Sequence, residues 1–253
     1  MEAHYHLISA LLIFAVGLAG GGWALRAGAA TNDRSQYLVR LGASMAGGVF
    51  LGAGLIHMMG DASDTLDAAF PGTDFPIAYA IAAIGFVLVL TVERVVFRAA
   101  SAAEGPFAYV LTLVLGLHSL LAGMALGIED SAVVGLAIVV AILAHKGSAA
   151  FSLGISFVRS GMDRKRAWGL LATFACVTPL GILIGSELGN VLSGPNGEIV
   201  EGFVDALAAG SFVYIAAIDI INEEFGEAEH SHLPGLAALL AGLGLMALLA
   251  LYV

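Results

Sequence analysis

The sequence predicts an all-α, polytopic membrane protein of eight transmembrane helices with both termini on the outer side. Three observations support this prediction. Of the 253 residues, 59% are hydrophobic and only 12% are charged, whereas about a quarter of a typical soluble domain is charged. Eight apolar stretches are long enough to cross a bilayer, which takes about 20 residues. The basic residues gather in alternate connections between these stretches.

The spans are expected at 7–25, 37–59, 77–97, 106–128, 131–157, 167–193, 203–221 and 233–253. Helix-breaking and charged residues separate them, as at Pro71-Gly72 and Gly105-Pro106. The first stretch is not preceded by a basic segment, so we expect a retained helix rather than a signal peptide. No connection is long enough for a soluble domain, and residues 1–253 are therefore predicted to form a single membrane domain.

The orientation follows from the positive-inside rule, by which Lys and Arg accumulate in cytoplasmic connections. Nine of the ten basic residues lie around the first, third and fifth connections: Arg26, Arg34, Arg40, Arg94, Arg98, Arg159, Arg164, Lys165 and Arg166. The second, fourth and sixth connections are acidic: Asp61, Asp64, Asp67, Asp74, Glu129, Asp130, Glu198 and Glu201. The net charge of −10 argues against a nucleic-acid partner, because phosphate binding needs a basic face.

Three histidines and one lysine fall within the expected spans: His57, His118, His145 and Lys146. An ammonium group inside a membrane costs at least about 2.5–3.5 kcal/mol on insertion scales, so an intramembrane lysine indicates a functional site. Three histidines from three helices can hold Zn²⁺ and leave one coordination position open. They could equally well be three separate hydrogen-bonding groups between helices.

Five short sequence motifs support the interpretation that the histidines bind a metal ion. They lie at 55–62, 118–127, 145–154, 178–181 and 209–215, and in this order they resemble signatures of the ZIP family of divalent metal (zinc/iron) transporters. The resemblance covers nearly the whole chain and has the same number of spans. It implies a ZIP-like helix bundle in the cell (inner) membrane, surrounded by lipid. It also implies a homodimer in which spans one, four, five and six move like an elevator against the other four.

The resemblance implies a transporter that moves zinc, or iron or manganese, toward the cytoplasm, with no permanently bound cofactor. It assigns His57, His118 and His145 as metal ligands. A second site, or one that tunes the first, would include Ser119, Lys146 and Thr178, and Met58 and Met124 are further candidate ligands.

The chain departs from this family at four positions. Members that bind two ions carry acids where this chain has Ala122, Lys146, Ala149 and Thr178. The lysine is a known family variant whose ammonium would take the place of the second cation. The missing glutamate at Ala122 would leave a divalent ion among neutral imidazoles, so weak binding is expected unless another carboxylate supplies the charge. Candidates for that role, or for the ion pathway, are Asp61, Glu187 and Asp219.

Two alternatives follow from these departures. The first is a metal sensor or a transport-impaired paralogue with the same fold, for which Ala122 is the main support. The second is an intramembrane metalloenzyme in which three histidines hold a zinc ion that activates water. Neither Ala122 nor Ala149, one turn beyond His118 and His145, can serve as a general base. We therefore expect no enzymatic activity.

Overall fold

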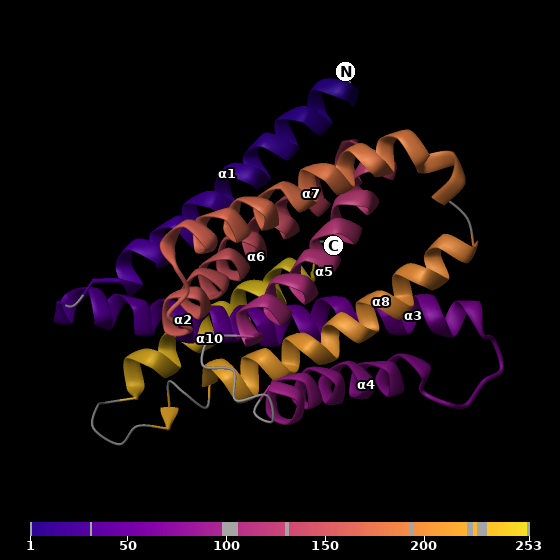
Figure 1. The fold of residues 1–253 in the computed structure, drawn as a ribbon. Helices are drawn as coiled ribbons and strands as arrows, with labels where there is room; N and C mark the ends of the chain where they lie inside the picture. The colour runs from indigo at the N-terminus through magenta and orange to yellow at the C-terminus, as the bar shows by residue number, and fades with distance from the viewer. Residues whose placement is uncertain are drawn as a thin grey trace.

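All elements of the computed structural model are helices in the parts of the chain it describes, residues 2–30, 32–97, 106–129, 132–192, 195–221, 225–226 and 232–251 (Figure 1). In chain order they are α1 Glu2–Gly28, α2 Asp33–Gly52, η1 Ala53–Met58, α3 Met59–Ala69, α4 Ile77–Thr91, η2 Val92–Phe97, α5 Pro106–Ile128, α6 Ala132–Arg159, α7 Arg164–Leu192, α8 Pro195–Tyr214, η3 Ile215–Ile221 and α10 Leu233–Leu249.

The three η segments are π-helices that continue α-helices without a break, so these elements make eight helical rods. Seven of the rods are long and apolar enough to cross a membrane. The last, α10, is shorter at 17 residues, which at 1.5 Å per residue extends about 26 Å, close to the thickness of a bilayer core. The predicted all-α, multi-pass membrane fold is confirmed.

Local sequence signals explain where several helices begin. The side chain of Asn32 accepts a hydrogen bond from the backbone N–H of Ser35 at 2.8 Å and so caps α2. Before α7, Asp163 accepts hydrogen bonds from the N–H groups of Lys165 and Arg166. Gly161, in the turn that precedes this cap, has a φ of +68°, a conformation that glycine adopts without strain.

One expectation about the outer connections was wrong. Asp61, Asp64 and Asp67 lie on helix α3, and Glu198 and Glu201 lie on helix α8, instead of in loops. The helical hydrogen-bond pattern continues past the end of an apolar stretch at no penalty when the added turns face water or a polar cavity. The predicted span edges, which followed apolar residues alone, therefore stopped short of these turns.

The helices pack as two groups. The first group contains α1, α5, α6 and α7, and the second contains the α2–η1–α3 rod, α4, α8 with η3, and α10. The closest approaches lie inside the groups. A Cβ atom on Gly123 of α5 would overlap the Thr178 carbonyl of α7, and one on Gly48 of α2 would overlap the Leu239 carbonyl of α10. Such small residues let membrane helices pack backbone against backbone.

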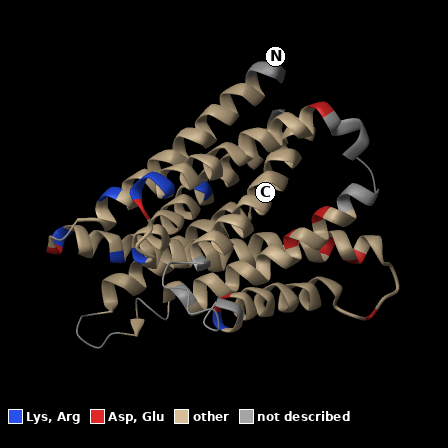
Figure 2. Cartoon of the chain, viewed as in Figure 1, with Lys and Arg blue, Asp and Glu red and all other residues tan. Residues whose placement is uncertain are grey.

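Charges separate along the molecule. Figure 2 shows Lys and Arg near the α1–α2 and α6–α7 turns, and Asp and Glu mostly toward the opposite end, where α3 ends and α8 begins. We call these the basic end and the acidic end. Both termini lie toward the acidic end in Figure 1, as an even number of crossings requires.

Candidate functional site

A cavity of about 430 Å³ lies between the two helix groups. From the first group it is lined by α5 and α6, and from the second by η1, α3 and α8. Its wall is mostly apolar, and six ionisable side chains converge on it: His57, Asp61, His118, His145, Glu201 and Asp205. A mainly apolar pocket with a few converging polar groups is typical of a binding site.

The three histidines predicted as ligands all line this cavity. His118 on α5 and His145 on α6 are each 7% exposed, and their ring centres are 5.6 Å apart. The Nδ1 atoms of both rings are buried and form no hydrogen bond. Buried polar atoms are nearly always satisfied in folded proteins, so this pair of imidazoles is suited to a ligand that supplies the missing interaction.

His57 enters the cavity from a π-helical segment. In η1 the N–H of Met59 bonds to the carbonyl of Gly54, five residues back. Such segments are rare and often occur at functional sites. The Nδ1 atom of His57 lies 3.0 Å from a carboxylate oxygen of Asp61, one turn along the same rod. Asp61, the first candidate for charge compensation, is therefore already paired with His57.

Asp205 on α8 lies beside His118, and the sequence reasoning missed it. Its Oδ1 atom is 3.7 Å from Nδ1 of His118, and its side chain is only 18% exposed. Glu201 lines the cavity one turn before it. The sequence did contain a signal for this residue. Asp205 falls inside the expected span at 203–221, and an acid within a span indicates a functional site by default.

Lys146 lies behind the cavity wall, not in the cavity. It is 1% exposed. Its ammonium donates hydrogen bonds to Ser119 Oγ at 2.9 Å, to Thr178 Oγ1 at 3.0 Å and to the Phe174 carbonyl at 3.2 Å. It also lies 3.6 Å from the centre of the Phe174 ring, a cation–π contact. The structure thus brings the three residues of the predicted second site together between α5, α6 and α7.

The remaining predicted residues are dispersed. Met58 lines the cavity and is 1% exposed. Met124 packs its backbone against Gly185 of α7 and does not line the cavity. Glu187 is exposed and lines a second cavity of about 670 Å³ between α1 and α7. Asp219 lies in η3, but its side chain is outside the described part of the structure. Ala122 lines the main cavity one turn from His118.

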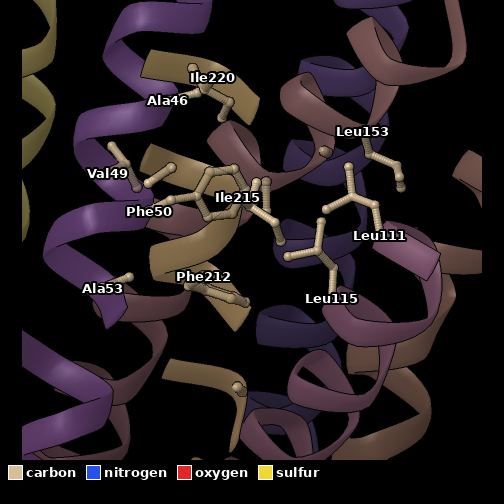
Figure 3. Packing of buried hydrophobic residues seen from close by; sticks show 14 of the residues in the cluster. Ala46, Val49, Phe50, Ala53, Leu111, Leu115, Leu153, Phe212, Ile215 and Ile220 are labelled. Atoms are coloured by element: carbon tan, nitrogen blue, oxygen red, sulfur yellow. The ribbon is translucent and has the colours of Figure 1, made fainter. Parts of the chain in front are cut away.

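An apolar layer fills the space between the histidines and the basic end. Figure 3 shows Leu111, Leu115 and Leu153 of the first group lying opposite Phe212 and Ile215 of the second. Each of these side chains is at most 2% exposed. Leu111 and Leu115 precede His118 on α5, and Leu153 follows His145 on α6, so the layer lies on the basic side of both histidines. The cavity extends the other way, past Val134 and Glu201 toward the acidic end.

The ligands do not form a closed coordination shell. Among the residues that the structure describes, no three His, Cys, Asp or Glu side chains are arranged to bind one metal ion. The groups lie instead in pairs, His57 with Asp61 and His118 with Asp205, with His145 beside His118.

Comparisons with known proteins agree with this picture. The family model described as ZIP Zinc transporter matches residues 3–106 and 98–250. Zinc transporter ZIP2 of Mus musculus is 26% identical, with 88% of each chain covered. Zinc transporter ZIP1 of Homo sapiens is 28% identical over 87% of this chain and 79% of the relative. Zinc transporter ZIP1 of Danio rerio is 30% identical over 81% and 82%.

These matches run through both helix groups and include every residue that lines the cavity between them. The eight rods match the number of spans expected from the sequence, and the three histidines named as candidate ligands line one cavity. The chain is a multi-pass integral membrane protein, and it belongs to the ZIP zinc transporter family.

Proposed function

We propose that this protein carries Zn²⁺, or a similar divalent ion such as Fe²⁺ or Mn²⁺, from the acidic end through the cavity toward the basic end. The positive-inside rule makes the basic end cytoplasmic, so the direction is inward. The observation that carries the proposal is the cavity itself. Three histidines line it at the depth where an apolar layer begins, and carboxylates line its path toward the acidic end. The ion is the substrate, and no resident cofactor is needed.

The residues divide the task by their chemistry. Imidazole nitrogens are good ligands for zinc and neighbouring first-row metals, so His57, His118 and His145 would bind the ion. Carboxylates at the mouth raise the local concentration of cations. The Lys146 ammonium lies between Ser119 and Thr178, and the family resemblance implies that it takes the place of a second ion. One ion per chain is therefore expected.

Transport requires that the apolar layer open and the outer cavity close. The division into two helix groups supports an elevator-like movement, because the backbone contacts through glycine lie within the groups and the cavity lies between them. Exposed apolar side chains such as Leu113, Val133 and Leu183 suit contact with lipid. The family resemblance further supports a homodimer in the cell membrane.

A metal sensor or a transport-impaired paralogue is the second candidate, and Ala122 favours it. A cavity of neutral imidazoles would bind a divalent ion weakly in a low-dielectric setting. Asp205 weakens that argument, because its carboxylate already lies beside His118 and can supply negative charge.

We infer transport rather than catalysis because the residues one turn beyond His118 and His145 are alanines, and neither can act as a base.

Zinc uptake by proteoliposomes containing the purified protein tests the proposal. The natural protein should accumulate Zn²⁺, and His118→Ala should lower uptake at least about tenfold, because losing a ligand weakens metal binding by that order. His6→Ala is a matched control, because His6 lines the other cavity; it should transport normally. Full uptake by His118→Ala would contradict the proposal, and uptake by neither the natural protein nor the control would favour the sensor.

A further inference from the structure

The polar side chains of the cavity belong to opposite helix groups. Among the residues that the structure describes, the first group contributes the two imidazoles of His118 and His145. The described carboxylates that line the cavity come from the second group: Asp61 on α3, and Glu201 and Asp205 on α8. In this part of the chain, the negative charge that faces an ion between the groups is therefore carried by the second group.

Asp205 lies beside one of the buried imidazoles. Its Oδ1 atom lies 3.7 Å from Nδ1 of His118, across the boundary between the groups. That nitrogen is buried and forms no hydrogen bond, so it remains available to a ligand. Asp61 points to a different partner, His57, at 3.0 Å. Of the two aspartates, only Asp205 is paired with a histidine of the other group.

A divalent ion beside His118 and His145 needs compensating charge. Two neutral imidazoles supply none, the neighbouring Lys146 side chain is cationic when protonated, and a low-dielectric interior strengthens the repulsion. Ala122, which also lines the cavity, cannot help. On the assumption of the proposed function, we propose that Asp205 is the counter-charge of the transported ion, so that the binding site is composite. The imidazoles of His118 and His145 lie on the first helix group, and the carboxylate lies with His57 on the second.

A composite site couples ion binding to the arrangement of the two groups. The ion is held by both ligand types only while α5 and α6 face α8. When the groups move relative to each other, the imidazoles and Asp205 separate, the ion loses its counter-charge, and its affinity falls. A glutamate at position 122 would do the opposite, because it would travel on α5 with His118. In this proposal, Asp205 on the second group replaces the carboxylate that is missing at position 122 on the first.

Calorimetric titration of the purified full-length protein with Zn²⁺ tests the counter-charge. Asp205→Asn keeps the size of the side chain but removes its charge, and should weaken binding at least about tenfold, the order found when the carboxylate partners of metal-binding histidines are removed. Glu187→Gln is the matched control, because Glu187 lines the other cavity; its affinity should equal that of the natural protein. Equal affinities for the two variants would overturn the proposal.

A double variant, Asp205→Asn with Ala122→Glu, separates a lost charge from a damaged fold. If Asp205 acts through its charge, the glutamate should restore Zn²⁺ affinity to within about threefold of the natural protein, a difference of about 0.6 kcal/mol. Uptake should recover together with affinity, because an acid at this position is found in transporters of the same family. Failure to restore affinity would overturn the role of Asp205 as the counter-charge.

Zinc transport and the composite site can be refuted separately. If the natural protein binds Zn²⁺ in a way that depends on Asp205 but takes up no Zn²⁺ into proteoliposomes, transport is refuted and the composite site stands. If the natural protein takes up Zn²⁺ and Asp205→Asn binds and transports it equally well, the composite site is refuted and transport stands.

Discussion

At the scale of single residues, Lys146 has the most unusual environment in the described part of the chain. Burying an ammonium group is costly unless its hydrogen bonds are satisfied. Two hydroxyls and one carbonyl accept from Lys146, and the Phe174 ring packs against it. Helices α5, α6 and α7 all contribute to this arrangement. The lysine thus occupies a position that is prepared for a cation.

Replacing the lysine by an acid should reopen that position. In Lys146→Asp the ammonium is gone, which leaves space beside Ser119 and Thr178, and the shorter side chain adds a carboxylate at the edge of that space. Together these oxygens can coordinate or orient an ion. We expect the number of Zn²⁺ ions bound per chain to rise above that of the natural protein, or the affinity at the main site to increase at least about tenfold. Equilibrium dialysis with metal analysis measures both.

Lys165→Asp is the control for this change, because Lys165 is exposed in the α6–α7 turn region and makes no contribution to the cavity. It should leave metal stoichiometry and affinity unchanged. If Lys146→Asp behaves in the same way, the lysine does not occupy a cation position, and its role is confined to holding the three helices together.

The sequence located most of the cavity residues, but not all of them. Histidines and a lysine inside apolar stretches are conspicuous, and the structure brings His57, His118 and His145 to one cavity. Asp205 was missed because sequence alone does not tell which face of α8 meets α5. Glu187, another candidate acid, lies on a long apolar helix but lines a different cavity. Only the rotation of each helix in the packed bundle separates these two acids.

At the scale of helices, glycine positions determine how closely α5 and α7 approach. Gly123 lies against the Thr178 carbonyl, and Gly181 lies against the Leu120 carbonyl. Because Ser119 and Thr178 both bind Lys146, this contact also sets the width of the lysine site. The apolar pattern predicted the helices themselves, but not these contacts, because a glycine in a membrane helix can face a neighbour or the lipid.

Gly123→Ala should therefore destabilise the protein. The added methyl group would overlap the Thr178 carbonyl, and overpacking of this kind typically costs about 1–3 kcal/mol. Thermal unfolding in detergent should show a lower Tm. Gly116→Ala, on the same helix, meets no atom within 4 Å and should leave the Tm unchanged. An equal Tm for both variants would show that the α5–α7 contact accommodates the added methyl group without loss of stability.

At the scale of the whole molecule, the two helix groups, the charge separation and the apolar layer combine into one arrangement. The cavity extends from the histidines toward the acidic end, and Leu111, Leu115 and Leu153 separate the histidines from the basic end. The orientation predicted from Lys and Arg makes the acidic end external. With this orientation the cavity would face outward, as the proposed inward transport requires.

Cysteine accessibility in intact cells tests whether the cavity faces outward and binds the ion. With Cys176 replaced by serine, Ala137→Cys adds a thiol to the cavity wall, and Lys165→Cys adds one near the α6–α7 turn at the basic end. A membrane-impermeant thiol reagent applied outside should label Ala137→Cys and not Lys165→Cys. Zn²⁺ should slow labelling at position 137, and additional replacement of His118 by alanine should abolish that protection. Labelling of Lys165→Cys alone, or labelling at 137 that Zn²⁺ leaves unchanged, would contradict an outward-facing cavity that binds the ion.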